Sequence, residues 1–282
     1  MNSTNEAVIT TPALQSERAK VLASEHGFAL SGIALLADDQ KSPRADAYES
    51  WLASGYHGPL DYMFNSRTPR TQLRARFEWA RSVLALGAFY ESTPRGEPGK
   101  DLIAHVARYA RSRDYHHIFT KRLKRLGQAL LDAGVCTQQH WYVDTGPVLE
   151  RAWAEKAGLG WIGKNSCLIH PRLGSYFLLA EIVMDSAPEP DTPAAPHWGT
   201  CRRCLDACPT QAFPAPGVLD ASRCIVTWNI EQRGQTPPEL WAQQGGWVVG
   251  CDICQSVCPF NSPARTPPPD AELGTLQPWH NM

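Results

Sequence analysis

The first two thirds of the chain carry apolar residues at the spacings of helices and buried strands. Residues 114–134 ("DYHHIFTKRLKRLGQALLDAG") place most of their large apolar side chains near one face of a helix, and Gly134 stands where such a helix would end. The apolar stretches at 80–90 ("ARSVLALGAFY") and 175–185 ("SYFLLAEIVMD") are short, and they predict buried strands.

Two further stretches extend this pattern. Residues 17–40 predict a helix followed by a short strand, the usual start of an α/β unit. Residues 141–157 predict a short strand ("WYV"), a turn at Asp144–Gly146, and a helix that begins at Pro147. The proline-rich stretch 186–199 ("SAPEPDTPAAPHWG") predicts a linker.

These elements divide the chain into three parts. We predict an α+β protein with an α/β domain at residues 1–190 and a cysteine-rich domain at 191–262. We expect the proline-rich tail at 263–282 to be poorly ordered.

Composition narrows the class of protein. The chain has 282 residues, 43% of them hydrophobic, so it can bury one large core or two smaller ones. It lacks the run of about 18 apolar residues that a membrane span needs, and its N-terminus does not have the pattern of a signal peptide. We therefore expect a cytoplasmic monomer that does not associate with membranes.

Charge is distributed unevenly, although the formal net charge is only −1. Residues 67–125 contain 14 Lys and Arg against five Asp and Glu, a local charge of +9. Such a segment suits a surface that meets a polyanion, but it also suits solvated helices whose charges segregate by chance. The sequence leaves both interpretations open.

Seven of the nine cysteines lie in the last third of the chain. Two runs, "CRRCLDACP" at 201–209 and "CDICQSVCP" at 251–259, each read C-x2-C-x3-C-P, and Cys224 lies between them. This is the second half of the ferredoxin run, so we predict iron–sulfur clusters, with zinc as the alternative. Cys136 and Cys167 stand alone, and we predict that both are buried thiols.

The cysteines are one short of two complete clusters. Two [4Fe–4S] clusters take eight thiolates, and this region has seven: Cys201, Cys204, Cys208, Cys224, Cys251, Cys254 and Cys258. The ferredoxin spacing puts the missing cysteine at position 198, which is Trp198. A [3Fe–4S] cluster or ligation by His197 would each account for the gap.

Four segments together resemble the epoxyqueuosine reductase family: "VDTGPVLERAWAEKAGLGWIGKNSCLIH", "GSYFLLAEIVMD", "CRRCLDACPTQAF" and "GCDICQSVCPFN". The resemblance covers about residues 17–262. It implies a cobalamin-binding α/β domain, similar to that of reductive dehalogenases, followed by a two-cluster ferredoxin-like module. It also implies reduction of epoxyqueuosine to queuosine at the tRNA wobble position, with electrons from a low-potential donor of the ferredoxin or flavodoxin type.

The resemblance also implies roles for individual residues. Cys201, Cys204 and Cys258 would hold the first cluster, and Cys208, Cys224, Cys251 and Cys254 the second. Asp144 would be the proton donor and a cobalamin contact. The alternative interpretation is that Asp144 only caps the helix that follows it, which is a purely structural role. The resemblance assigns further cobalamin contacts to Arg67, Lys164 and Asn165, and close backbone approach to a bulky ligand to Gly160 and Gly163.

Some features fit other interpretations. His116 and His117 are helical neighbours that point about 100° apart, so we predict a surface or RNA-facing pair and not a metal site. Members of the family continue past the second cysteine run with a helical-repeat extension, so tRNA contact here is expected to rest on residues 67–125 or on another polypeptide. The alternative functions are another corrinoid reductase, a ferredoxin-like electron carrier and a zinc-held nucleic-acid module.

Overall fold

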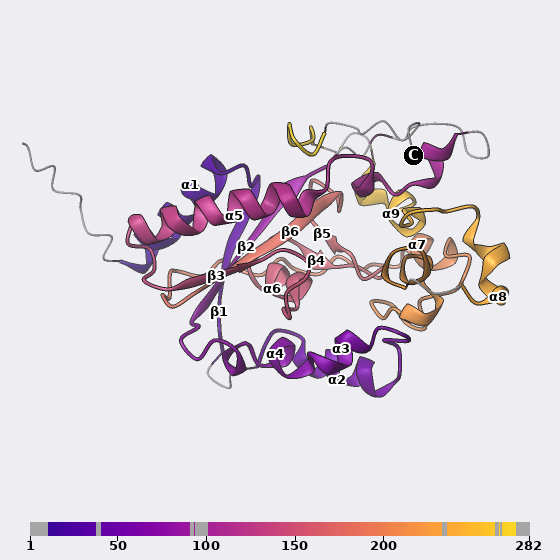
Figure 1. Ribbon diagram of the computed structural model, residues 1–282, viewed down its shortest axis with the longest axis horizontal. Helices are drawn as coiled ribbons and strands as arrows, with labels where there is room; N and C mark the ends of the chain where they lie inside the picture. The colour runs from indigo at the N-terminus through magenta and orange to yellow at the C-terminus, as the bar shows by residue number, and fades with distance from the viewer. Residues whose placement is uncertain are drawn as a thin grey trace, which may run out of the picture.

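A four-stranded antiparallel sheet lies at the centre of the α/β domain (Figure 1). The computed structural model describes residues 11–37, 41–90, 93, 101–232, 236–262, 265 and 267–274. The strand order is β1–β2–β6–β3, and the strands are β1 (Leu30–Leu35), β2 (Ser82–Phe89), β3 (Gln139–Tyr142) and β6 (Phe177–Met184). The predicted strands at 80–90 and 175–185 are confirmed as β2 and β6.

Helices cover both faces of the sheet (Figure 1). On one face, α1 (Pro12–Glu25) and α5 (Tyr115–Asp132) pack against the even-numbered residues of β2. On the other, α6 (Glu150–Lys156) and the segment around Phe77 pack against the odd-numbered residues. Every residue of β2 is buried because both of its faces are covered.

Local sequence sets the ends of α5. The Asp114 side chain accepts a hydrogen bond from the His116 backbone N–H, and Gly134 follows the helix with a φ of +67°. The helix predicted over 114–134 is therefore confirmed. None of the helices within the described residues has both the length and the apolar composition needed to cross a bilayer.

The helix predicted to begin at Pro147 begins three residues later, at Glu150. Residues 144–147 form an irregular turn instead, and Asp144 has a φ of +55°, in the left-handed region. The Glu150 carboxylate accepts a hydrogen bond from the Asp144 backbone N–H at 2.8 Å. The Glu150 side chain thus holds the backbone of this turn, and the turn takes the place of the first helical turn. Helix propensity does not predict this contact.

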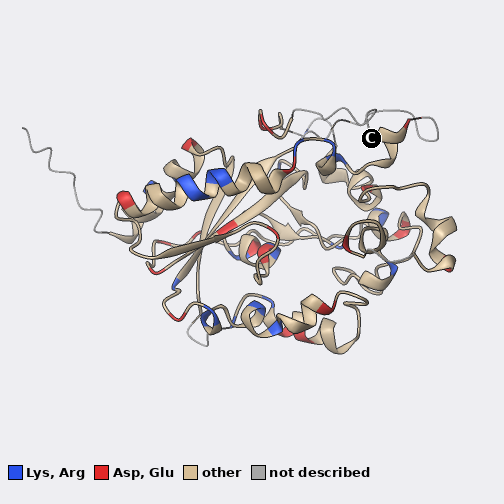
Figure 2. Cartoon of the chain, in the orientation of Figure 1, with Lys and Arg blue, Asp and Glu red and all other residues tan. Residues whose placement is uncertain are grey.

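Short helices lie beyond the sheet. The segment after β1 contains α2 (Ala45–Ala53), α3 (Asp61–Asn65), α4 (Arg67–Thr71) and η1 (Leu73–Ala75), and η2 (Leu102–His105) and η3 (Arg108–Ala110) precede α5. The basic segment 67–125 thus includes α4 and α5, which lie on opposite sides of the sheet (Figures 1 and 2). Its positive charge is therefore spread over more than one face.

Residues 200–262 form the cysteine module, at the right of Figure 1. The hairpin β4 (Trp161–Ile162) and β5 (Leu168–Ile169) precedes the predicted linker 186–199, which has no regular structure. The module itself has only short elements: α7 (Arg203–Asp206), η4 (Ala221–Arg223), η5 (Thr227–Glu231), α8 (Pro238–Trp241), η6 (Ala242–Gln244), α9 (Ile253–Ser256) and η7 (Pro259–Asn261).

The described part of the tail, residues 267–274, is not loose. Leu273 is fully buried in the core beside α5, and Asp270 and Glu272 both form ion pairs with Arg122, at 2.8 and 2.6 Å. The expectation of a poorly ordered tail is wrong for these residues, because composition does not reveal one apolar side chain and two carboxylates placed opposite α5. Residues 275–282 lie outside the described part of the chain.

Candidate functional site

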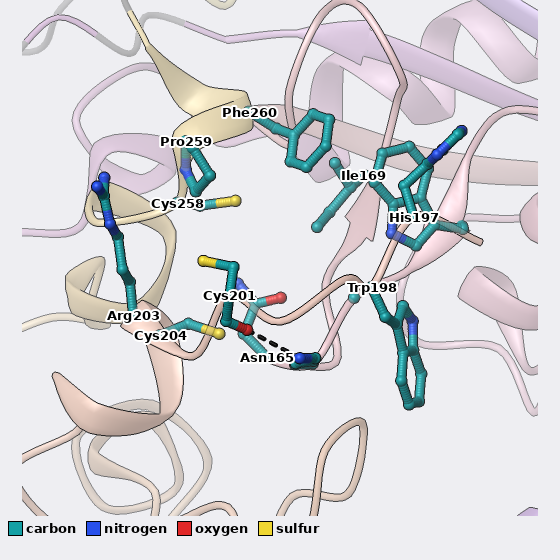
Figure 3. Close-up of a pocket in the computed structure, with 13 residues that line it drawn as sticks. Asn165, Ile169, His197, Trp198, Cys201, Arg203, Cys204, Cys258, Pro259 and Phe260 are labelled. Atoms are coloured by element: carbon teal, nitrogen blue, oxygen red, sulfur yellow. Dashed lines mark hydrogen bonds between the residues drawn. The ribbon is translucent and has the colours of Figure 1, made fainter.

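The cysteines of the two runs group across the runs. Cys201 and Cys204 of the first run line one cavity together with Cys258 of the second. Figure 3 shows the three sulfur atoms directed toward a common space. Burial and then the charge of Cys258 raise the pKa of the Cys204 thiol, which confirms that these sulfurs lie close together.

The second group shows the same crossing. Cys208 of the first run lies near Cys224 and Cys251, as their electrostatic interactions show. Burial, and to a smaller extent these neighbouring sulfurs, raises the pKa of Cys251 to about 12. Cys254 belongs to the same group of sulfurs, because Cys251 and Cys224 contribute to its raised pKa. Several thiolates packed this closely repel one another unless iron supplies positive charge. The donor set is therefore suited to a metal cluster.

The spacing of these ligands suits a cluster better than a single ion. Within the described residues, no three His, Cys, Asp or Glu side chains are close enough to hold one metal ion. A zinc ion holds four ligands at about 2.3 Å, whereas a cluster offers a separate iron to each cysteine and so takes ligands that lie further apart.

Cys167 is not isolated, contrary to the prediction from sequence. Its thiol forms a hydrogen bond with the sulfur of Cys254, and it also interacts electrostatically with Cys258 and Cys224. Its backbone N–H donates to Asn165, whose side chain in turn donates to the Cys254 carbonyl at 3.3 Å. No spacing rule connects Cys167 to the two runs, so this contact could not be predicted from the sequence.

Lys164 and Asn165 join the α/β domain to the cysteine module. Lys164 Nζ donates to the carbonyl oxygens of Gly199 and Cys201, at 2.8 and 2.9 Å, and Asn165 reaches α9 as described above. Both side chains therefore hold the loops that carry the cysteines. Their predicted contact with cobalamin stays a prediction.

Asp144 occupies the turn between β3 and α6, and its side chain is more than half exposed. One carboxylate oxygen lies 3.1 Å from Nε2 of His116, and Nδ1 of the same imidazole lies 2.8 Å from Asp114. Asp144 is therefore not the helix cap that was the alternative interpretation. The imidazole of His116 connects two carboxylates, a role that sequence reasoning missed when it placed His116 on the surface.

Electrostatics favour a protonated His116. Burial opposes the imidazolium, but hydrogen bonds to Asp144 and Asp114 outweigh it and raise the pKa of His116. In the same way, slight burial is outweighed by the hydrogen bonds from His116, which lower the pKa of Asp114. His116 can thus hold a proton directly beside Asp144 near neutral pH.

Two glutamates lie beneath this turn. Burial and then the negative charge of Asp144 raise the pKa of Glu150 to about 7. Glu181 in β6 is fully buried, and burial and then the charge of Glu150 raise the pKa of Glu181 well above its ordinary value. The pair is therefore neutral or shares a single charge, and sequence patterning identified Glu181 only as a strand residue.

The charge of Asp144 acts on three tyrosines from three separate elements. Burial raises the pKa of Tyr62 in α3 and of Tyr109 in η3 to about 12, and it raises the pKa of Tyr115 at the start of α5 further; the charge of Asp144 contributes at all three. Tyr62 also lies 3.2 Å from Glu231 of the cysteine module. The surroundings of Asp144 thus include neutral phenols and a side chain network that reaches the module.

The remaining predicted residues occupy other environments. Arg67 is exposed, and its guanidinium lies 4.6 Å from the centre of the Phe64 ring. A Cβ on Gly160 would come within 2.2 Å of the Ile169 carbonyl oxygen, and one on Gly163 within 2.5 Å of the Ile169 side chain. Close packing against the backbone of β5 therefore requires a glycine at position 160, whereas a side chain at position 163 would displace the end of the Ile169 side chain.

Two parts of the chain match known families. Residues 197–261 match the family described as 4Fe-4S double cluster binding domain, and residues 70–145 match the family described as Epoxyqueuosine reductase QueG, DUF1730. Proteins named epoxyqueuosine reductase are similar over most of the chain. That of Synechocystis sp. is 42% identical over 252 residues, 88% of this chain and 86% of that protein. That of Gloeobacter violaceus is 43% identical over 252 residues, 89% and 76% of the two chains.

Solved structures share the fold. An epoxyqueuosine reductase crystallised with an epoxyqueuosine-modified tRNA-Tyr stem loop superposes with a TM-score of 0.79 at 29% identity, over 92% of this chain and 68% of that one. The Bacillus subtilis epoxyqueuosine reductase, with a catalytic aspartate loop swung out of its active site, gives 0.75 at 28% identity, over 91% and 68%. A reductive dehalogenase studied for B12-dependent dehalogenation gives 0.52 at 14% identity, over 92% and 34%, which shows a common fold.

Proposed function

The chain belongs to the epoxyqueuosine reductase family, and we propose that it reduces epoxyqueuosine to queuosine at the wobble position of tRNA. The observation that carries this proposal is the 42% identity to a named epoxyqueuosine reductase, over 86% of the length of that protein. The reaction takes two electrons and two protons, and the epoxide oxygen leaves as water. The protein must therefore deliver electrons and a proton to one place.

The electrons are assigned to the two clusters. We assign Cys201, Cys204 and Cys258 to the first cluster and Cys208, Cys224, Cys251 and Cys254 to the second. The crossed grouping of the sulfurs supports this assignment, because in two-cluster ferredoxins the last cysteine of each run binds the other cluster. Each cluster passes one electron at a time, and a low-potential ferredoxin or flavodoxin is the donor that we expect.

The second cofactor in this proposal is cobalamin, seated beside Asp144. The charge of Asp144 acts on Tyr62, and Tyr62 and Phe64 of α3 are exposed large apolar side chains, so this region offers apolar and phenolic contacts that suit a large corrin. Cobalamin supplies a strongly nucleophilic cobalt in its Co(I) state. Arg67, Lys164 and Asn165 are its further proposed contacts, the last two at the boundary with the cysteine module.

Asp144 is the proposed proton donor to the epoxide oxygen. Its carboxylate lies 3.1 Å from His116 Nε2, so a protonated His116 can return a proton to it after each transfer. Asp114 on the far side of the imidazole fixes the orientation of the ring. The Asp144 side chain is more than half exposed, so a substrate can reach its carboxyl group.

The rest of the assignment follows from this function. We propose residues 1–190 as the cobalamin-binding domain, 191–262 as the ferredoxin-like module and 263–282 as the tail. The partner is tRNA that carries epoxyqueuosine, and the protein acts in the cytoplasm as a monomer. The basic side chains of residues 67–125 supply phosphate contacts on more than one face.

Turnover of the modified tRNA tests the proposal. Protein reconstituted anaerobically with iron, sulfide and cobalamin is incubated with epoxyqueuosine-tRNA and a low-potential reductant, and the nucleosides are separated by mass. Queuosine that accumulates with the reductant, and that does not form when cobalamin is withheld, is the expected result. Cobalamin binding without any queuosine would show that the substrate is a different one.

A further inference from the structure

The turn that carries Asp144 is tightly folded. The Thr145 backbone N–H donates to the Val143 carbonyl at 2.6 Å, so Asp144 stands at the centre of a three-residue turn, with a φ of +55°. A residue with a Cβ adopts such a φ only where neighbouring contacts hold its backbone there. The place of the Asp144 carboxyl group, 3.1 Å from His116 Nε2, therefore depends on the contacts that hold this turn.

Glu150 holds the backbone of Asp144 itself. Its carboxyl oxygen Oε1 accepts a hydrogen bond from the Asp144 backbone N–H at 2.8 Å. Arg70 acts further along the chain, where its Nη1 donates to the Val148 carbonyl at 3.0 Å. The bond from Glu150 is therefore the contact that can fix the backbone of the proposed proton donor directly.

The Glu150 side chain is anchored to the core of the α/β domain. Glu150 is the first residue of α6, and Trp153 and Ala154 of the same helix are fully buried. The charge of Glu150 also acts on Glu181 of β6, which is fully buried and whose two carboxyl oxygens have no hydrogen-bond partner within the described residues. The Glu150 carboxyl group thus lies between a rigid core and the turn, and it can keep Asp144 in one position.

We propose that Glu150 is a positioning residue for the proton donor: its hydrogen bond to the Asp144 backbone N–H fixes the turn in which the Asp144 carboxyl group meets His116. Without this bond, Asp144 is free to leave the left-handed region, and its carboxyl group then moves away from the imidazole. The bond needs an oxygen acceptor at this place and does not need the charge of Glu150. This inference rests on the role of Asp144 proposed above.

Substitutions in the full reconstituted protein separate the hydrogen bond from the charge. Glu150→Ala removes both, so kcat for epoxyqueuosine-tRNA should fall about 10²-fold. KM should stay close to wild type, because Glu150 is not a proposed tRNA contact. Glu150→Met keeps the length of the side chain without an oxygen acceptor and should behave like Glu150→Ala, whereas Glu150→Gln keeps the acceptor and should restore most of the turnover.

The same helix offers a matched control. Glu155 also accepts a hydrogen bond from a backbone N–H, that of Ile162 at 2.8 Å, but it lies outside the Asp144 turn. Glu155→Ala should therefore keep the kcat of the wild type. A fall in kcat in both Glu150→Ala and Glu155→Ala would mean that losing any such bond at α6 is enough, and it would refute the specific role of Glu150.

A second measurement does not depend on turnover. The hydrogen bond to Asp144 helps to raise the pKa of His116, so this pKa reports whether the two side chains are in contact. It is followed by NMR of ¹³C-labelled histidine in the reconstituted protein without tRNA, and His116→Asn identifies the signal. The pKa of His116 should fall in Glu150→Ala and Glu150→Met and should stay at the wild-type value in Glu150→Gln.

The two measurements distinguish this inference from the proposed function. A wild-type pKa of His116 in Glu150→Ala would show that the turn does not depend on Glu150, and it would refute the inference. Glu150→Gln that is as inactive as Glu150→Ala would also refute it, because the charge and not the bond would then matter. If the wild-type protein formed no queuosine, the proposed function would fail, and the pKa of His116 would still decide whether Glu150 positions Asp144.

Discussion

The α/β domain and the cysteine module are held together by different means. Both buried apolar clusters lie around the central sheet, and the largest fully buried side chains, including Trp153 and Phe119, belong to the α/β domain. Between residues 200 and 262 the buried apolar side chains are Ala212, Ala221, Ile225 and Leu240. So small a core stabilises little, and we infer that the folding of the module depends on its clusters, as in small metal-binding domains.

The largest expected effect is the loss of a cluster ligand. Cys251→Ala removes one of the four thiolates that we propose for the second cluster, so iron content should fall by about half and the module should open. Limited proteolysis should then cut within residues 200–262 and leave the α/β domain intact. Cys136→Ala, in the core of the α/β domain, is the control and should cost only about 1 kcal/mol. A module that resists proteolysis without its iron would break the comparison.

The next largest effect is expected on turnover, from a substitution in the α/β domain. Asp144→Asn retains the size of the side chain but cannot donate an acidic proton, so turnover should fall about 10²- to 10⁴-fold. Iron content should stay at the wild-type level, because Asp144 lies in the α/β domain and is not one of the proposed cluster ligands. Asp132→Asn, at the other end of α5, should have full activity. Equal activity of the two variants would remove Asp144 from the mechanism.

A smaller effect concerns stability against pH. The folded pKa of Glu150, about 7, lies above its ordinary value of 4.5, so its protonated form stabilises the fold below pH 4.5 and this contribution is lost as pH rises through 7. Glu150→Gln cannot ionise, so the variant does not lose this stabilisation as pH rises. Its amide oxygen still accepts the hydrogen bond from the Asp144 backbone N–H. We expect the variant to gain up to about 3 kcal/mol relative to wild type between pH 5 and 8.

Chemical unfolding across that pH range measures this gain. Exposed Glu49→Gln in α2 is the control, and it should leave the pH dependence of the free energy of unfolding as it is in the wild type. If the free energy of unfolding changed with pH in the same way for wild type and Glu150→Gln, ionisation of Glu150 would not destabilise the folded protein.

The smallest effect is expected at the boundary between the two regions. Cys167→Ala removes the hydrogen bond to the sulfur of Cys254, and such bonds raise the potential of a cluster. Iron content should stay unchanged, while a redox titration followed by EPR should show a lower potential for the second cluster. Cys167→Ser keeps a donor and should lie closer to wild type. Lost iron in Cys167→Ala would instead make Cys167 a ligand.

The sequence predicted the elements whose cause is local. The apolar runs of β2 and β6 have the length of strands, and α5 has an apolar face, a capping Asp114 and a terminal Gly134. Cysteine spacing predicted the gap at Trp198, and the family resemblance implied the crossed ligand groups with which the grouping of the sulfurs agrees. Each of these signals lies within a short window of the chain, where spacing and propensity determine the result.

The missed features depend on contacts between distant residues. His116 lies 28 positions before Asp144, and Cys167 lies 87 positions before Cys254, so no window contains either pair. Such pairs become visible only when α5, β3 and the module meet in space. The start of α6 and the need for Gly160 were missed although the partners lie close in sequence, because propensity does not specify that Glu150 bonds the Asp144 backbone or that Ile169 packs against Gly160.

The return of residues 267–274 to α5 gives the chain an unusual connectivity. It leaves the sheet through the linker at 186–199 and comes back at Leu273, so the module is attached to the α/β domain at both ends. The electron-carrying part is thus an insertion between two segments of one scaffold. After a nick in the connection at 186–199, the two fragments would be held together without a covalent link, in part by the packing of Leu273 and the ion pairs of Arg122 with Asp270 and Glu272.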